Sequence, residues 1–346
     1  MGDTAPDAED FVRDTESFRR ELLAYCYRML GSVHDAEDLV QETYLRAWRF
    51  YAGFEGRSSL RSWLYRIATN ACLTELENRG RRMLPSGLGG PEQDPEAPPE
   101  AAGSEVRWLQ PIPDAQVYSE SADPAVIVAS LEGLRLALVA SFQYLPARQR
   151  AVLILREVLR FPAVEVAEML DTTTAAVKST LQRARARLEQ VAPVAEEITE
   201  PAEPQLRALL NQYIAAFENA DAAALKQLLC QDVILEATPL QTWFAGCETC
   251  LPYLTRYVLG SPGDWRMVPT NANGQPAAVA YLRDDNGIYQ AYGIVVLTIT
   301  ITGIARISSF GDPTLVATFD AESATTSCAT SAAGGPPPRP SPTRNW

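Results

Sequence analysis

The 346-residue sequence has few of the residues on which many functions depend. It contains one histidine, His34, and six cysteines, of which only Cys247 and Cys250 lie close together. Such cysteines do not make the disulfide framework of a small secreted domain, so we expect a reducing, cytoplasmic environment. The most apolar stretch, residues 294–307, contains Thr298, Thr300 and Thr302 in alternation with Leu297, Ile299 and Ile301, which is the period of a strand and not of a membrane helix. We expect no membrane span and, from the polar start of the chain, no signal peptide.

Positive charge is scarce. The formal net charge is −13 at pH 7 and the pI is about 4.7, which argues against a protein that coats nucleic acid by charge alone. Any contact with DNA must therefore be local and depend on shape. Acidic residues gather in a stretch where Arg107 is the only cation: Glu92, Asp94, Glu96, Glu100, Glu105, Asp114, Glu120 and Asp123. We interpret this stretch as a linker and not as a binding face.

Residues 32–78 predict two helices joined by a loop. Gly31 is typical of a helix end, and Ser32, three residues before Asp35, is typical of a helix start. Four residues of the first helix recur at helical spacing and share a buried face: Ala36, Val40, Tyr44 and Ala47. The outward residues are Asp35, Asp38, Gln41, Glu42 and Arg46. Taken alone, this pattern also fits an ordinary solvated helix surface.

The second helix follows the loop Phe54–Ser59, whose last serine is a typical N-cap. Trp63, Arg66 and Asn70 share one face of this helix, and its other face is apolar, with Leu60, Leu64, Ile67 and Ala71. A base swung out of a duplex needs an aromatic plane, a cation for phosphate and a hydrogen-bonding group for the base edge. The alternative is that Trp63 is simply a core residue.

The segments DAEDLVQETYLRAW and FEGRSSLRSWLYRIATNACL together resemble region two of the bacterial RNA polymerase sigma factors, in the extracytoplasmic-function (ECF) group. The resemblance implies that an acidic face binds the clamp helices of the largest polymerase subunit, through Asp35, Asp38, Gln41 and Glu42. It also implies that the loop and second helix open the minus-ten promoter element and hold a flipped base. The residues in this role would be Phe54, Ser58, Ser59, Trp63, Arg66 and Asn70.

Residues 81–125 lose helical periodicity and are rich in proline, glycine and acids, so we predict a flexible linker. The segment RWLQPIPD within it contains Trp108, Leu109 and Ile112, apolar side chains that a passive linker does not need. We expect this island to dock on polymerase or on the last domain of the chain. In the second case the three side chains would be buried against that domain.

Residues 126–192 predict a second helical domain that contains a helix-turn-helix, with its turn at Asp171. The last helix has a buried stripe of Val177, Leu181, Ala184 and Leu188. An exposed stripe beside it would carry Lys178, Gln182 and Arg185, flanked by Ser179, Arg183 and Arg187. Short residues near Thr174 let a helix approach a DNA groove while the cations neutralise phosphates. A basic helix that is merely solvated is the alternative.

The segment LPARQRAVLILREVLRFPAVEVAEMLDTTTAAVKSTLQRARARL resembles sigma region four. The resemblance implies binding to the minus-thirty-five element through the exposed residues of the last helix, and contact with the polymerase flap. Two positions depart from the family pattern: Phe161-Pro162 replaces a common glycine entry, and Asp171 replaces a turn glycine. Because Asp tolerates the left-handed conformation, we expect the turn to survive.

We predict a second linker at residues 193–203, a third domain at residues 204–320 and a disordered tail at residues 321–346. Helices followed by alternating strands indicate an α+β fold, a curved sheet around helices. The segment NADAAALKQLLCQDVILEATP resembles the SnoaL-like branch of the NTF2-like fold, which extends some ECF sigma factors. Some members of that fold are isomerases or cyclases. The candidate carboxylates here, Asp232, Glu236 and Asp264, lack a histidine partner, and Cys247 and Cys250 lack a thioredoxin-like setting.

We therefore predict a multidomain protein: an all-α sigma region 2, an all-α helix-turn-helix region 4 and an α+β SnoaL/NTF2-like cone domain. The predicted function is a cytoplasmic sigma factor that binds core RNA polymerase, recognises promoter DNA and opens it, modulated by its own third domain. We predict no enzyme activity, cofactor or metal, and leave a small ligand of the third domain open. The alternatives are a one-component helix-turn-helix regulator with a ligand-sensing domain and, third, a cyclase or isomerase.

Overall fold

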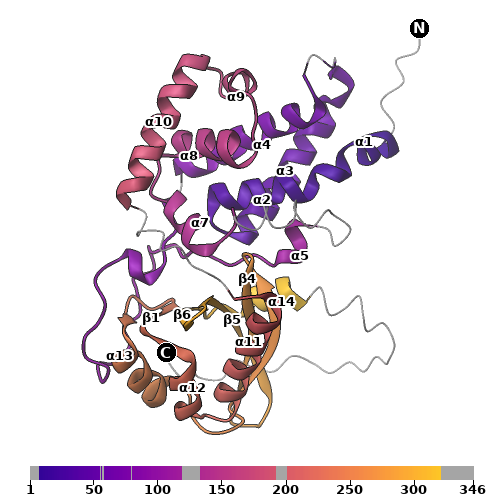
Figure 1. Cartoon of the computed structure of the whole chain (residues 1–346). Helices are drawn as coiled ribbons and strands as arrows, with labels where there is room; N and C mark the ends of the chain where they lie inside the picture. Colours follow the sequence, from indigo (N-terminus) through magenta and orange to yellow (C-terminus); the bar gives the residue numbers. More distant parts are fainter. Residues whose placement is uncertain are drawn as a thin grey trace. The chain divides into compact units, whose positions relative to one another are not determined.

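The computed structural model describes residues 8–54, 56, 58–78, 80–118, 133–191 and 201–320. Their contacts divide the chain into two compact units. Unit 1 comprises Met1–Met83, Glu105–Ile198 and Ala272–Gly274, and unit 2 comprises Leu84–Ser104, Thr199–Asn271 and Gln275–Trp346. The predicted boundary at residues 125–126, most of the second linker and the tail at 321–346 lie outside the described residues. Figure 1 labels most of the elements of both units.

The first four helices of unit 1 are α1 (Ala8–Thr15), α2 (Arg19–Leu30), α3 (Val33–Phe50) and α4 (Leu60–Asn78), with 3₁₀ turns at Glu16–Phe18 and Tyr51–Gly53. Gly31 ends α2 with φ 69°, which glycine adopts without steric cost. Ser32 Oγ accepts a hydrogen bond from Asp35 N (3.2 Å), and Ser59 Oγ accepts one from Ser62 N (3.0 Å). Both predicted helix starts are confirmed.

Helix α2 is buried on all sides from Leu22 to Leu30, after an exposed start at Arg19 and Arg20. A helix without a solvent face needs partners on all sides, and α2 has them in α3, α4 and the second helical part of unit 1. Its one buried cation, Arg28, donates through Nε to Gly133 O (3.0 Å). Burial lowers the pKa of Arg28 to about 10, so the side chain keeps its charge at neutral pH.

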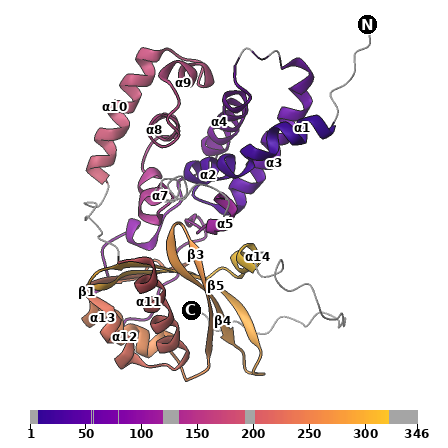
Figure 2. The ribbon, with the colours of Figure 1, turned by 45° about the vertical axis from the view of Figure 1, so that its right-hand side comes forward.

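The second helical part of unit 1 contains a helix-turn-helix. Its elements are α5 (Asp114–Val117), α7 (Leu136–Phe142), α8 (Ala147–Leu153) with a π-helical turn at Ile154–Val158, α9 (Ala163–Met169) and α10 (Thr174–Val191). Figure 2 shows α8, α9 and α10 following one another in space. Asp171 has φ 48°, so the expected left-handed turn forms without glycine. Val177 and Ala184 are buried and Leu181 and Leu188 half-buried, as the predicted stripe requires.

Unit 2 is α+β, as predicted. Its helices are α11 (Glu203–Glu218), α12 (Ala222–Leu228), α13 (Cys247–Tyr253), which continues as a π-helical turn at Leu254–Val258, and α14 (Pro313–Asp320). Its strands are β1 (Leu229–Thr238), β2 (Trp243–Ala245), β3 (Trp265–Ala272), β4 (Gln275–Arg283), β5 (Tyr289–Thr300) and β6 (Gly303–Phe310). The sheet order is β2-β1-β6-β5-β4-β3, with β1 parallel to β6. Figures 1 and 2 show α11, α12 and α13 on one side of the sheet, where they enclose an apolar core.

The alternating run at residues 294–307 falls in β5 and β6, which confirms its interpretation as strand. Within the described part of the chain, no helix combines the length and apolarity that crossing a membrane requires.

Residues 84–104, which we call the strap, follow the β1–β2 edge of the sheet in unit 2. Trp243 contributes two contacts, since its Nε1 donates to Gly89 O (2.9 Å) and its carbonyl accepts from Glu92 N (2.8 Å). Gln241 N donates to Glu100 O (2.9 Å), and Ala102 N donates to Pro239 O (3.0 Å). This bonded path differs from the flexible linker predicted for residues 81–125, because an edge strand offers backbone groups that a linker of any composition can pair with.

Candidate nucleic-acid interface

The outward side of α10 carries the residues expected to meet duplex DNA. Lys178, Ser179, Gln182, Arg183 and Arg185 are all exposed. Arg185 pairs with Glu157 of the preceding π-helical turn, and this hydrogen bond raises the pKa of Arg185. Arg183 Nη2 donates to Thr180 Oγ1 (3.2 Å) on its own helix. The cations therefore project from a helix whose opposite face is held in the core of unit 1.

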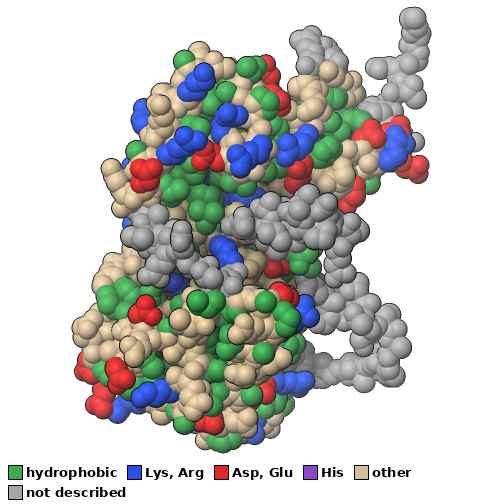
Figure 3. Space-filling view, viewed as in Figure 1, with side chains coloured by type: hydrophobic (Ala, Val, Ile, Leu, Met, Phe, Trp, Pro, Cys, Tyr) green, Lys and Arg blue, Asp and Glu red, His purple; other side chains and the backbone are tan. Residues whose placement is uncertain are grey.

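The start of α10 has a capped end and short side chains, which the expected approach to a DNA phosphate requires. Thr173 Oγ1 accepts from Ala176 N (3.1 Å) and so caps the helix. The next residues, Thr174 and Ala175, are short and exposed. A helix start with small side chains brings backbone N–H groups and the positive end of the helix dipole to the surface. Figure 3 shows Lys and Arg side chains gathered over α8, α9, α10 and α4 on the visible side of unit 1.

The side of α4 that was expected to hold a flipped base is partly exposed. Arg66 and Asn70 are exposed and Trp63 is half-buried. The Trp63 ring packs on Phe54 from the preceding loop, with centroids 5.0 Å apart and planes tilted by 36°. Trp63 therefore lies at a surface beside a second aromatic ring, in a position where a base could stack.

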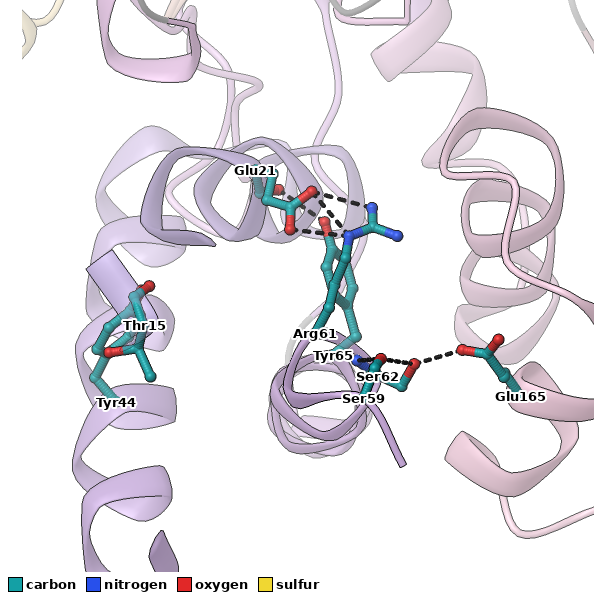
Figure 4. A network of polar contacts seen from close by, with 8 residues as sticks. All are labelled: Thr15, Glu21, Tyr44, Ser59, Arg61, Ser62, Tyr65 and Glu165. Carbon is teal, nitrogen blue, oxygen red and sulfur yellow. Dashed lines mark hydrogen bonds and ion pairs between the residues drawn. The ribbon is translucent and has the colours of Figure 1, made fainter. Parts of the chain in front are cut away.

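The two serines at the loop end differ in exposure and in their contacts. Ser58 is half-buried, and Ser59, the cap of α4, also lies 2.8 Å from Ser62 through their hydroxyl oxygens. Ser62 in turn donates to the carboxylate of Glu165 on α9, as Figure 4 shows. The start of α4 is thus bonded to the first helix of the helix-turn-helix. Sequence analysis missed this contact, because neither residue belongs to a motif.

A second contact joins the same two helical parts. Arg61 on α4 binds Glu21 in a bidentate pair (3.0–3.1 Å) and lies 4.3 Å from the centroid of the Phe161 ring. Tyr65 meets Phe161 edge to face, with ring centroids 4.9 Å apart. Phe161 is the residue that replaces the family's glycine entry, and it is buried here. Its aromatic ring explains the departure, since a glycine would leave Arg61 and Tyr65 without this partner.

Arg150 on α8 is a buried cation that binds the end of α2. Its Nη1 donates to Met29 O and to Gln143 Oε1 (2.8 Å), and its Nη2 donates to Gln143 O (3.2 Å) and Leu145 O (3.1 Å). Burial lowers its pKa to about 10, so it stays charged at neutral pH at the negative end of the α2 dipole. No pattern in the sequence distinguishes Arg150 from the surface arginines of the basic segment.

The acidic face of α3 divides into two parts. Asp38 and Gln41 are exposed, and Glu42 forms an ion pair with Arg46 one turn later. Asp35 lies deeper, where Oδ2 binds Arg82 Nη2 (2.6 Å) and Arg107 Nη2 (3.2 Å). Asp35 is therefore engaged within unit 1, whereas Asp38, Gln41 and Glu42 lie farther along the surface of α3.

Apolar side chains missed by sequence analysis extend that surface. Leu45, Trp48 and Phe50 on α3 are 60%, 39% and 66% exposed. The signal was available, because these residues fall outside the buried stripe that ends at Ala47. Exposed aromatic and aliphatic side chains beside acids are typical of a protein-binding surface.

The Trp108 island is docked inside unit 1. Leu109 N donates to Met83 O (2.9 Å) and Gln110 N donates to Gly31 O (3.0 Å). Leu109 and Ile112 are fully buried and Trp108 half-buried. A Cβ on Gly31 would lie 2.7 Å from Leu109 Cδ1, so the glycine that ends α2 also makes room for the island.

Unit 1 also includes the turn Ala272–Gly274, where Asn273 is fully buried. Asn273 Nδ2 donates to Tyr27 Oη (2.8 Å) and Leu134 O (2.6 Å), and its Oδ1 accepts from Ile112 N (3.0 Å). Sequence analysis missed this residue as well. The Asn-Gly pair between two strand-like runs was its signal, because that pair is typical of a tight hairpin turn.

The candidate catalytic residues of unit 2 are engaged or exposed. Asp232 is exposed, Glu236 binds Arg306 (2.9 Å) and Ser308 (2.9 Å), and Asp264 binds Arg283 (3.0 Å). The thiols of Cys247 and Cys250 are buried, and burial raises the pKa of Cys250 to about 12. Across the described ranges, no three His, Cys, Asp or Glu side chains are grouped so that they could hold a metal ion.

Comparison with known proteins agrees with this geometry. The family models for Sigma-70 region 2 and Sigma-70 region 4 match residues 15–82 and 135–188. The ECF RNA polymerase sigma factor SigG of Mycobacterium tuberculosis is 47% identical over 312 residues, covering 90% of this chain and 83% of that protein. SigW of Bacillus subtilis, also an ECF sigma factor, is 30% identical over 53% of this chain and 88% of its own length. The crystal structure of the M. tuberculosis ECF sigma factor SigJ has a similar fold, with a TM-score of 0.58 and 21% identity over 89% of this chain and 98% of that chain.

Proposed function

The chain belongs to the ECF RNA polymerase sigma factors, which direct transcription initiation, and we propose that its structure is the closed, DNA-free state of such a factor. In this proposal α4 and α10 are the two promoter-reading helices. The observation that carries it is the packing of α4 on α9, through Ser62 with Glu165 and through Arg61 with Phe161. This packing ties the minus-ten reader to the helix that precedes the minus-thirty-five reader.

The proposed binding sites cannot both be occupied in that state. Promoter elements at minus ten and minus thirty-five are about 25 base pairs apart, or roughly 85 Å at 3.4 Å per base pair. Because α4 and α9 touch through their side chains, α4 and the neighbouring α10 lie too close together to reach both promoter elements at once. Promoter binding therefore requires the α4–α9 contacts, and the Arg150 contact with the end of α2, to separate.

Each surface has a proposed partner. The clamp helices of the largest polymerase subunit bind Asp38, Gln41 and Glu42, and the flap region contacts the helix-turn-helix. Promoter DNA binds α10 at minus thirty-five and the Phe54–Asn70 surface at minus ten. The protein acts with polymerase in the cytoplasm. Asp35 is already paired with Arg82 and Arg107, so its role in this state is to hold the linker. Asp35 can contact polymerase only after these ion pairs break.

Core-polymerase binding is testable by charge reversal on α3. Asp38→Lys is expected to weaken affinity for core enzyme about tenfold, because one exposed acid is lost and a like charge is introduced. Glu77→Lys, an exposed acid on α4, is the control and should bind normally. Surface changes of this kind usually alter stability by less than about 0.5 kcal/mol. Equal affinity of the Asp38→Lys variant and wild type would remove this interface.

Unit 2 is proposed to regulate and not to catalyse. Residues 84–104 of the linker are bonded within unit 2 and the residues that follow are bonded within unit 1, so the segment between the two promoter readers is held at both ends. Asn273 further secures Ile112 and Tyr27 in unit 1. The one-component regulator is disfavoured by the half-buried Trp63 beside Phe54 and the exposed Arg66 and Asn70, a proposed base-holding surface that a repressor does not need.

Cutting the chain after Val194 tests this role. The truncated chain should differ from the full chain in transcription output from a cognate promoter with purified core polymerase, because the contacts that hold the linker are lost. Trp108→Ala should change output in the same direction. Identical output from all three proteins would mean that unit 2 does not regulate initiation.

A further inference from the structure

Unit 2 encloses a cavity of about 60 Å³ between the sheet and its covering helices. Aromatic rings dominate its walls. Phe244 and Tyr253 pack with centroids 4.3 Å apart, and Trp265 meets Tyr292 edge to face at 5.0 Å. Leu235 and Leu240 close other parts of the wall. A pocket with several rings and a few polar groups is typical of a small-molecule site.

The polar groups at this cavity are hydroxyls. Thr242, Ser309 and the phenols of Tyr213, Tyr253 and Tyr292 provide them, and among the described residues that line the cavity none is charged at neutral pH. Burial raises the pKa of Tyr253 to about 12, so this phenol stays neutral. A charged ligand would lose its hydration without gaining an ionic partner. The walls therefore favour a neutral ring with a single hydrogen-bonding group.

The cavity must expand to take such a ring. A cavity of about 150 Å³ holds benzene, and the space here is less than half of that. Most of the wall belongs to long paired strands and helices. The exception is the segment from Leu240 to Phe244, which contains most of the turn after β1 and the first two residues of the three-residue edge strand β2. A short edge segment is the part of a sheet that moves at least cost.

That same segment is the one that the strap holds. Leu240 pairs with Ala101 and Phe244 pairs with Glu92 as isolated β-bridges. Thr242 Oγ1 accepts from Glu100 N (3.0 Å). Thr242 is therefore bonded to the strap through its own side chain, and the strap bonds at Leu240 and Phe244 are made by the backbone of their neighbours Pro239, Gln241 and Trp243. Displacement of this wall must break these strap contacts.

We propose that the cavity binds a small neutral aromatic molecule and that its binding loosens the strap from the β1–β2 edge. The strap requires residues 240–244 in their present position, whereas the ligand requires them displaced, so binding of one opposes binding of the other. By linkage, release of the strap raises affinity for the ligand by the same factor as the ligand weakens the strap. The inference goes beyond the proposed function and does not depend on it, because both effects occur without polymerase or promoter.

The first test uses p-cresol as the probe and p-toluate, a carboxylate of similar size, as its charged control. With the full chain, p-cresol should bind saturably in calorimetry. It should also increase amide hydrogen exchange across residues 92–102 about tenfold, because the strap spends more time detached. Failure of p-cresol to bind, equal binding of p-toluate, or unchanged exchange in the strap at saturation would each overturn the proposal.

Two variants locate the effect. Ala237→Phe fills the cavity from β1 and should weaken p-cresol binding at least about tenfold. The control is Ile234→Phe, which should bind p-cresol normally. Ile234 lies one and three residues from the cavity residues Leu235 and Ala237, so its side chain belongs to the other face of the strand. Glu100→Pro removes a strap N–H without altering the cavity wall. It should tighten p-cresol binding several-fold, a result that remains measurable if Ala237→Phe does not fold. Unchanged or weaker binding by Glu100→Pro would contradict the coupling.

Discussion

Helices α4 and α10 are both amphipathic and both carry residues expected to contact promoter DNA, yet their polar sides differ. On α10, Lys178, Gln182 and Arg183 are exposed. On α4, Ser62 is bonded to Glu165 and Arg61 is bound between Glu21 and Phe161. In the proposed closed state, the helix proposed to read the minus-thirty-five element is therefore exposed, whereas the start of the helix proposed to read the minus-ten element would have to be released first.

The largest expected effect comes from Arg150, which ties α8 to α2. Arg150→Ala leaves the carbonyls of Met29, Gln143 and Leu145 without their donor and should destabilise unit 1 by about 3 kcal/mol. Amide hydrogen exchange in α2 and α8 measures this loss locally. Arg148→Ala, an exposed residue of the same helix, should change exchange very little. Similar protection in both variants would mean that Arg150 does not hold the closed state.

The next effect separates promoter opening from promoter binding. Trp63→Ala should leave holoenzyme bound to the duplex but slow strand opening, since stacking contributes about 1–3 kcal/mol per base. Asn70→Ala, an exposed change, should act in the same direction without disturbing the Phe54 contact. Permanganate reactivity of thymines near the start site reports opening. Normal reactivity in both variants would return Trp63 to a purely structural role.

A smaller and opposite effect is expected at Glu165. Glu165→Ala removes the acceptor of the Ser62 hydroxyl and should favour separation of α4 from α9 by about 1 kcal/mol. Because α4 must be free before it can open the promoter, the rate of promoter opening should rise about fivefold. Glu168→Ala changes an exposed acid on the same helix and is the matched control for lost negative charge. If both variants accelerate opening equally, charge and not the α4–α9 contact is responsible.

The smallest effects concern α10 itself. Arg183→Ala should weaken binding to all DNA sequences and reduce the slope of log affinity against log salt by about one, because one phosphate contact is lost. Gln182→Ala should leave that slope unchanged and relax preference at one base pair. Competition binding over a salt series distinguishes them. A phosphate role for Arg183 is refuted if the slopes of wild type and variant coincide.

The sequence predicted what depends on a single helix or its caps. Ser32 and Ser59 cap α3 and α4, and Asp171 forms the left-handed turn, because each of these features is local. The exposed stripe of α10 follows from periodicity alone. The family resemblance then supplied roles for these residues that periodicity could not.

Contacts between distant segments could not be predicted in this way. Ser62 meets Glu165 across 103 positions and Asn273 meets Tyr27 across 246, and neither pair has a sequence pattern. The strap was predicted to be flexible from its composition, but its hydrogen bonds use backbone groups, which composition does not report. Arg150 was hidden among surface arginines because burial of a charge depends on acceptors that fold around it.

The distance between the two reading parts tests the closed state most directly. Fluorophores can be attached to Glu77→Cys in α4 and Val164→Cys in α9, because both positions are exposed. Labelling is selective because the described native thiols are buried. Cys328, which lies outside the described residues, is replaced by serine. In the free protein, single-molecule energy transfer should report a separation within about 30 Å, the length of one such helix. In the complex with core polymerase and promoter, it should increase toward roughly 85 Å. An unchanged separation in a complex that transcribes would contradict the account.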